Sequence, residues 1–512
     1  MGEPKAAWEA AELTKSGARD PQGDVAEEVG GAKLGLPASV ALVVGNIVGT
    51  GIFLLPASLA AIGTISILVF GLVTIGAVAL AIVFGKLGGR IPASGGPYAY
   101  ARDAFGEFMG FWTAWSFWLT AWIGNAAIAF AWVGYVNYFL KWDSTGGKLL
   151  IGLVGLWIPA LINLSGVKNI GAFQLVTTVL KFIPLLFVGI VGLFFMSSAN
   201  FPAFNVEGTS FLAAISAAAG LILFAYSGME SVTIVAERIK NPARNIGKAS
   251  VYGVLACAAM YMLATVAVFG NVPSGALANS SAPFADAINN MFGGSIGGGL
   301  MAACAIISGI GALNGWTMLV AEMPMAAARD GMFPKVFGRL SKRDAPTVGI
   351  IVGTILTSLM LLYAYLGSES GFNDILYLAS FTTAIPYFFS AGAQLFWLVT
   401  GGREVNKARM ARDLTMAGLA LLFSAWIVYG SGEQAVMLGV LALLVGVPVF
   451  IWTKATRGEY GARETAPSPA LATGGPGTGM GTGTGTEPPP GGPPAGPSDG
   501  PPPGPGPAGP GS

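Results

Sequence analysis

The first apolar segment of the chain is interrupted by Gly45-Asn46-Ile47-Val48-Gly49-Thr50-Gly51, and the sixth by Phe224-Ala225-Tyr226-Ser227-Gly228-Met229-Glu230. Glycine inside a helix costs about 1 kcal/mol relative to alanine, so the cluster of glycines predicts that the first segment unwinds locally. Unwound backbone at membrane depth is tolerated only where protein buries it or where it lines a cavity. Helices broken at corresponding places in two halves of a chain are typical of the binding site of a secondary transporter.

The composition places the rest of the chain in a membrane. Of its 512 residues, 53% are hydrophobic and 10% charged, whereas soluble domains carry about 25% charged residues. Apolar runs of about 20 residues, rather than alternating segments of about 10, indicate transmembrane helices and not a β-barrel. The sequence therefore predicts an all-α polytopic membrane protein. It contains no histidine, so any proton coupling must use carboxylates, a lysine, tyrosines or water.

Twelve predicted spans of about 20 residues each organise the chain. They lie near residues 37–61, 64–86, 108–140, 147–164, 171–196, 210–235, 249–270, 295–326, 347–366, 373–399, 412–430 and 434–453. We expect residues 35–455 to form one transporter domain between tails at 1–34 and 456–512. The first tail has no apolar core, so we expect no cleavable signal peptide. The second is rich in proline and glycine, and we expect both tails to be disordered.

The basic residues predict the orientation. With the N-terminus inside, all but three of the 27 lysines and arginines fall in loops or tails on the cytoplasmic side; the exceptions are Lys141, Lys148 and Lys181. Such a bias supports an even number of spans, with both termini in the cytoplasm. We therefore expect a multi-pass protein of the cell (inner) membrane. Twelve spans divide into two halves of five and two additional helices. The interrupted spans one and six then occupy equivalent positions of inverted repeats.

Four motifs carry a resemblance to a known family. They are Gly45–Pro56, Ser94–Arg102, Lys240–Ile246 and Ala328–Pro334. The first resembles the first-span signature of the amino acid–polyamine–organocation (APC) superfamily, and the others resemble its loops after spans two, six and eight. Within the superfamily, the chain is most similar to the basic amino acid/polyamine antiporters, which include bacterial arginine/agmatine antiporters. The resemblance covers about residues 37–453 and implies a LeuT-like fold of 5+5 inverted repeats with helices one and six broken.

The two breaks suit the two charged ends of an amino acid, each of which needs a partner in a low-dielectric site. Backbone N–H groups after Gly49, with the Thr50 hydroxyl, suit a carboxylate. Carbonyls in the second break suit an ammonium. The alternative interpretation of the glycines is close helix packing. The predicted substrate-binding residues are Asn46, Gly49, Thr50, Gly51, Asn125, Phe224, Ala225, Ser227, Gly228 and Trp316.

Aromatic residues complete the predicted site. Trp316 in span eight could stack on a guanidinium or cap a cation, as the resemblance implies, or it could simply be packed. The resemblance also implies that Asn125 hydrogen-bonds a guanidinium and that Phe117 and Phe224 form an aromatic gate. The family has a tyrosine and a tryptophan at those two positions, so the substitutions leave the substrate open.

Two ionisable residues inside predicted spans are candidates for coupling. Glu230 matches a glutamate that the antiporter family uses in proton-linked coupling; the alternative is a structural carboxylate. Lys181 resembles the fifth-span lysine of other APC members, where it takes the place of a sodium ion between spans one, five and eight. It is interpreted as a fixed or a titrating cation and argues against sodium dependence. Glu322, near the cytoplasmic end of span eight, is interpreted as a structural carboxylate or one that pairs with a loop.

These observations predict a secondary active amino acid transporter that works by alternating access. We expect it to exchange a cationic amino acid, arginine, for its amine, agmatine; the alternative is a proton-coupled or facilitative transporter of neutral amino acids. Without histidine, a metal-ligand cluster or a nucleophile motif, an enzyme is not expected, and a non-transporting sensor is a further alternative. We expect no cofactor, metal or nucleic acid. The expected partners are the small-molecule substrate, the lipid bilayer and, by resemblance, a second copy that meets span twelve.

Overall fold

The computed structural model describes residues 34–91, 95–165, 170–236, 239–343, 345–367, 370–400 and 407–458, apart from the side chains of Thr50 and of residues 170–179. The chain divides into two units, Met1–Tyr460 and Gly461–Ser512. The predicted tails at 1–34 and 456–512 lie almost entirely outside the described residues, so their disorder stays a prediction.

The described part of the chain is helical, and its one β-bridge joins Leu34 to Ile239. The α-helices are α3 (Leu36–Ile47), α4 (Leu55–Ile62), α5 (Ile65–Arg90), α6 (Pro97–Phe105), α7 (Glu107–Leu140), α8 (Thr145–Leu164), α9 (Ile170–Val191), α10 (Phe211–Phe224), α11 (Ser231–Ile234), α12 (Pro242–Asn271), α13 (Ser274–Ala278), α14 (Pro283–Phe292), α15 (Ile296–Arg329), α16 (Thr347–Leu366), α17 (Gly371–Thr400), α18 (Lys407–Gly430) and α19 (Gly432–Thr456). Short 3₁₀ helices are η1 (Thr50–Phe53), η2 (Gly192–Phe194), η3 (Ser198–Asn200) and η5 (Lys335–Gly338).

Length and composition make this a multi-pass membrane protein. Within the described ranges, nine helices are long and apolar enough to cross a bilayer: α5, α7, α8, α12, α15, α16, α17, α18 and α19. Three shorter apolar helical pieces accompany them, Leu36–Ile47, Leu180–Phe194 and Phe211–Phe224. Each of the twelve predicted ranges overlaps one of these elements. The three short pieces lie in the two interrupted segments and in the fifth segment.

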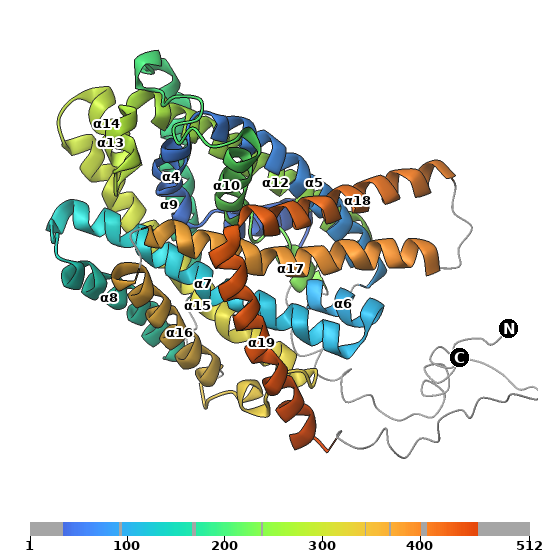
Figure 1. Cartoon of the computed structure of the whole chain (residues 1–512). Coiled ribbons are helices and arrows are strands. Elements are labelled where there is room, and N and C mark those ends of the chain that lie inside the picture. Colours follow the sequence, from blue (N-terminus) through green and yellow to red (C-terminus); the bar gives the residue numbers. More distant parts are fainter. Residues whose placement is uncertain are drawn as a thin grey trace, which may run out of the picture. The chain divides into compact units, whose positions relative to one another are not determined.

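Packing brings the interrupted segments into the middle of the bundle. Helix α12 packs against α5 and α3, α15 packs against α7, and α10 lies against α5, α17 and α18. Helices α17 and α18 run side by side, with α17 also against α7 (Figure 1). The buried core therefore surrounds both breaks, as the membrane-depth argument requires.

Basic residues gather at one end of the bundle, which we call the basic end. Arg90, Arg329 and Lys454 lie in the last turns of α5, α15 and α19. Ion pairs at this end include Arg102 Nη1 to Asp330 Oδ2 at 3.5 Å and Lys454 Nζ to Glu107 Oε2 at 2.8 Å. Figure 1 shows α6 at this end and α13 and α14 at the other. These three short helices were not distinguished in the sequence.

Candidate functional site

The first break lies between α3 and η1. Helix α3 continues through Gly45 and Asn46 to Ile47, and Val48 and Gly49 are extended, with φ/ψ of −77/93° and −97/175°. The chain then enters η1 and resumes an α-helix at Leu55. The predicted unwinding is therefore confirmed, but it is shorter than the glycine cluster suggested because Gly45 and Asn46 remain helical.

The second break separates α10 from α11. It covers Ala225 to Glu230 as a series of turns. Gly228 has φ of +105°, and a Cβ atom there would lie 2.9 Å from the carbonyl carbon and oxygen of Asn46. Glycine is the residue that adopts such a φ without steric cost. Gly228 thus lets the second break touch the end of α3 directly.

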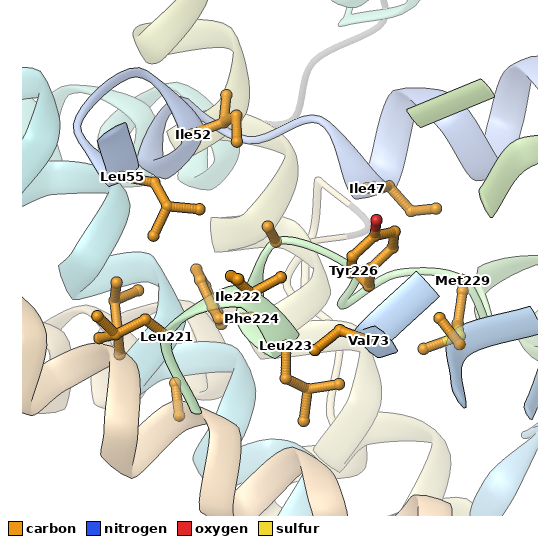
Figure 2. Close-up of a cluster of buried hydrophobic side chains, with 14 of the residues drawn as sticks. Ile47, Ile52, Leu55, Val73, Leu221, Ile222, Leu223, Phe224, Tyr226 and Met229 are labelled. Carbon is orange, nitrogen blue, oxygen red and sulfur yellow. The ribbon is translucent and has the colours of Figure 1, made fainter. Parts of the chain in front are cut away.

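A small pocket lies where the two breaks meet. Its volume is about 20 Å³, which is room for about one water. Six predicted residues line it, Gly49, Gly51, Phe224, Ala225, Ser227 and Trp316, together with Ile47, Ile52, Leu55, Ile128, Leu221, Tyr261 and Leu376. Figure 2 shows the first segment, with Ile52 and Leu55, passing over the second segment, with Leu221 and Phe224. We call this the central pocket.

Larger pockets flank the central pocket toward both ends. One, of about 460 Å³, lies at the end opposite the basic end and includes Leu54, Phe130, Ser281 and Tyr365. The other, of about 290 Å³, includes Tyr98, Phe117, Val235 and Glu322, and we call it the basic-end pocket. The structure therefore has a closed centre between two wider compartments.

Two aromatic side chains form part of the central wall. Phe224 packs so closely on α7 that a Cβ atom at Gly124 would lie 2.6 Å from its ring. The same ring lies next to Gly51, and Trp316 reaches the pocket from α15. Phe117, by contrast, lines the basic-end pocket. The two predicted gate residues therefore belong to different compartments, and their gating roles stay predictions.

The predicted residues Asn46, Asn125 and Gly228 are not part of the lining of the central pocket. Asn46 Nδ2 donates to Leu42 O within α3 at 3.0 Å, so its side chain serves its own helix. Asn125 is buried and Nδ2 lies 3.4 Å from Thr317 Oγ1, while no described donor reaches Asn125 Oδ1. The side chain of Thr50 lies outside the described part.

The sequence was compared with models of known protein families. Residues 34–453 match the model of the family described as amino acid permease. The chain belongs to the amino acid permease family. This confirms the resemblance found in the sequence motifs, and the members of this family are permeases rather than enzymes.

Curated relatives of this permease transport amines and basic amino acids. It is 32% identical to the putrescine transporter PotE of Escherichia coli K12, over 81% of this chain and 94% of that protein. Identity is 30% with the arginine/ornithine antiporter of Pseudomonas aeruginosa, over 83% and 92% of the two chains. Identity is 33% with the cadaverine/lysine antiporter of E. coli K12, over 70% of this chain and 82% of that protein.

In this permease, Glu230 is part of a buried hydrogen-bond network at the second break. The residue is 2% exposed, and its Oε2 accepts hydrogen bonds from Tyr387 Oη at 2.7 Å and from Gly228 N at 3.2 Å. The carboxylate is therefore linked both to α17 and to the glycine that touches α3. The sequence analysis did not identify Tyr387. A tyrosine within an apolar helix does indicate a buried hydrogen bond, because its hydroxyl needs a partner when it is buried.

Lys181 supports the first break from α9. It is 2% exposed, and Nζ donates to Val48 O at 3.1 Å. Tyr261, also missed in the sequence, donates to Ile47 O at 3.1 Å. The predicted link from Lys181 to the first span is thus present. A hydrogen bond from Lys181 to α15 is absent among the described residues, so that part of the predicted bridge is not made in this conformation.

Proposed function

We propose that this permease is a secondary active transporter that exchanges a cationic amino acid for an amine by alternating access. Arginine and agmatine are the first pair to test. The observation that carries the proposal is the meeting of two helix breaks at one closed pocket, which offers unwound backbone to a small charged molecule. The relatives that act on putrescine, arginine, ornithine, cadaverine and lysine support a cationic substrate class.

The two breaks divide the recognition of an amino acid between them. The segment around Gly49 and Gly51 would offer N–H groups to the carboxylate, with the Thr50 hydroxyl as an additional donor. At the second break, the carbonyls of Ala225 and Ser227 accept no hydrogen bond from a described residue. They would receive the ammonium, whose desolvation needs such acceptors.

The side chain of the substrate would extend between Trp316 and Phe224. An aromatic face attracts a guanidinium or ammonium through its quadrupole. Asn125 Oδ1 is an acceptor without a described donor, which suits a guanidinium N–H. This arrangement favours arginine over a neutral amino acid, because a neutral side chain would leave the acceptor unpaired.

The transport cycle follows from the closed conformation. We infer twelve transmembrane helices arranged as 5+5 inverted repeats, the basic end in the cytoplasm, and both termini there as well. Opening the layer between the central pocket and each flanking pocket in turn would give alternating access. We also propose that two copies of the chain form a homodimer through α19.

A second candidate is proton-coupled or facilitative transport of neutral amino acids. The hydrogen bond from Lys181 to Val48 O favours it, because a fixed cation at the first break replaces a coupling ion. Phenylalanine at positions 117 and 224, where the antiporters have other aromatics, also favours it.

Counterflow in proteoliposomes separates these candidates. Vesicles with the full chain would be loaded with unlabelled arginine and diluted into labelled arginine, agmatine, ornithine, putrescine, lysine or leucine. We expect rapid accumulation of label for arginine and agmatine and none for leucine. Accumulation of leucine in vesicles loaded instead with leucine, with no accumulation of arginine or agmatine in the arginine-loaded vesicles, would contradict the cationic proposal. Binding without any flux would indicate a sensor.

A further inference from the structure

Helix α7 packs against two helices that each contain an interior proline, α15 and α17 (Figure 1). The prolines are Pro324 in α15 and Pro386 in α17. A proline has no N–H group, so the carbonyl four residues before it loses its helical hydrogen bond. The carbonyls concerned are Val320 O in α15 and Thr382 O in α17. Both residues are buried, so each carbonyl needs another donor.

Two side chains of α7 supply these donors. Ser116 Oγ donates to Thr382 O at 2.7 Å, and Trp118 Nε1 donates to Val320 O at 3.1 Å. Ser116 and Trp118 are themselves buried. They are two positions apart, which places them about 200° apart around α7 and about 3 Å apart along its axis. The two donors therefore reach two different neighbours from nearly the same level of α7.

In α15, the turn that contains the proline belongs to the wall of the basic-end pocket. Trp316, which precedes this turn, lines the central pocket. Met323 and Met325, on either side of Pro324, line the basic-end pocket. The helix is therefore weakened between its contact with the central pocket and its basic end.

In α17, the turn that contains the proline has an equivalent place. Leu376 lines the central pocket before the turn. After the turn, Arg90 Cζ of the basic end lies 4.7 Å from the centre of the Trp397 ring, so the last part of α17 reaches the basic end. Phe117, which stands between the two donors in the sequence of α7, lines the basic-end pocket. Both weakened turns therefore lie between the central pocket and the basic end.

We propose that Ser116 and Trp118 are positioning residues for transport, because their hydrogen bonds hold the two proline turns as pivots. The basic-end parts of α15 and α17 move about these pivots and open the basic-end side of the central pocket, while α7 stays in place. A turn with an unpaired buried carbonyl would be unstable, and a turn with its own N–H donor would be stiff. This inference rests on the proposed function and adds to it the places at which the helices bend.

Double-mutant cycles on the purified full chain test the pairing of donor and proline. Ser116→Ala leaves Thr382 O without a donor and should lower the melting temperature. In Pro386→Ala the alanine N–H can donate to Thr382 O, so adding Ser116→Ala to this variant should lower the melting temperature much less. Trp118→Phe and Pro324→Ala form the second cycle, with the same expectation. Equal losses with and without the proline would overturn the pairing. A Ser116→Ala chain that can be purified only together with Pro386→Ala would show the same coupling.

Exchange of labelled arginine in proteoliposomes tests the role in transport, apart from stability. In the double variant Ser116→Ala with Pro386→Ala, the carbonyl is paired again but the turn is stiffer. Its maximal exchange rate should fall about fivefold, the factor expected when one additional hydrogen bond restrains the movement. Its Kd for arginine should not change, because the central pocket is intact. A wild-type exchange rate in this variant would overturn the pivot.

Two matched controls change the same residue types elsewhere. Pro448→Ala adds an N–H group within α19, at an exposed position outside the central and basic-end pockets. Ser424→Ala removes a buried hydroxyl of α18, but its acceptor Ala420 O keeps the helical hydrogen bond from the backbone N–H of residue 424. Both controls should exchange at the wild-type rate, and the same loss in either would overturn the pivots. A wild type that exchanges no cationic substrate would instead overturn the proposed function, whereas the melting temperatures would still report the pairing.

Discussion

At the first break, the carbonyls of Ile47 and Val48 accept hydrogen bonds from Tyr261 and Lys181, which come from α12 and α9. At the second break, the backbone largely supplies its own hydrogen bonds: Ser227 N donates to Phe224 O, and Ser231 N donates to Gly228 O. A cation is placed at the first break and a carboxylate at the second. Side chains of other helices also reach the second break, where Ser250 Oγ of α12 donates to Met229 O at 3.2 Å and Tyr387 of α17 donates to Glu230. The charge at the first break comes from another helix, whereas the carboxylate at the second break belongs to the same segment.

The two breaks therefore depend on different parts of the molecule. Removing a side chain on another helix should disturb the first break, because a buried carbonyl loses its donor. At the second break the backbone turns supply most of the hydrogen bonds, so a change in that backbone should disturb it more than the loss of one side chain on another helix.

The largest effect is expected for Gly228→Ala. Its Cβ would lie 2.9 Å from the Asn46 carbonyl in a backbone with φ of +105°. The alanine would strain the backbone at this φ and push the two segments apart, which together should cost about 2–4 kcal/mol of stability and abolish exchange. Gly106→Ala is a matched control, since Gly106 has φ of +89° and open space around the Cβ position. Equal melting temperatures of the two purified variants would contradict the close contact.

Lys181→Ala should have the next largest effect. It leaves Val48 O without a donor, a loss of about 1–3 kcal/mol for a buried group, and exchange should fall sharply. Lys181→Arg should not restore it fully, because a planar guanidinium replaces a compact ammonium poorly. Wild-type exchange should proceed at its full rate in sodium-free buffer. Strict sodium dependence, or normal exchange by the alanine variant, would refute the role of Lys181.

Glu230→Gln should affect the pH profile more than the fold. The amide keeps the size of the side chain and removes its titration, so the dependence of exchange rate on pH should flatten. Tyr387→Phe removes one hydrogen bond to Glu230 and keeps the carboxylate, so its profile should stay dependent on pH. Exchange rates from pH 5 to pH 8 in both variants give the comparison. If Glu230→Gln keeps the wild-type profile, another group couples protons.

The smallest effect is expected for Trp316→Leu, which leaves both breaks intact. Loss of one aromatic contact to a cation should weaken binding of arginine by about 1 kcal/mol, or about fivefold in Kd. The stability of the empty protein should hardly change. Trp452→Leu, on the exposed face of α19, is the matched control and should leave Kd unchanged. A lower stability with unaltered Kd would instead indicate that Trp316 only packs.

The sequence predicted the breaks because glycine clusters act locally. It also predicted that Lys181 supports the first span, because the family resemblance aligned that lysine. Tyr261 and Tyr387 escaped prediction, since their partners lie 214 and 157 residues away and depend on how whole helices pack. Likewise, Phe117 and Phe224 resembled one gate in sequence, but their helices place them in different pockets.

The narrow centre between two wider pockets has an electrical consequence. Pockets of about 290 and 460 Å³ admit water, whereas the central pocket of about 20 Å³ holds one at most. The membrane voltage therefore falls mainly across a thin layer around the two breaks, and one elementary charge that crosses it exchanges about 2.3 kcal/mol per 100 mV. An amine carries one more positive charge than its parent amino acid. Exchange of the two would move net charge through that layer in every cycle, so the membrane potential would set how far the exchange proceeds.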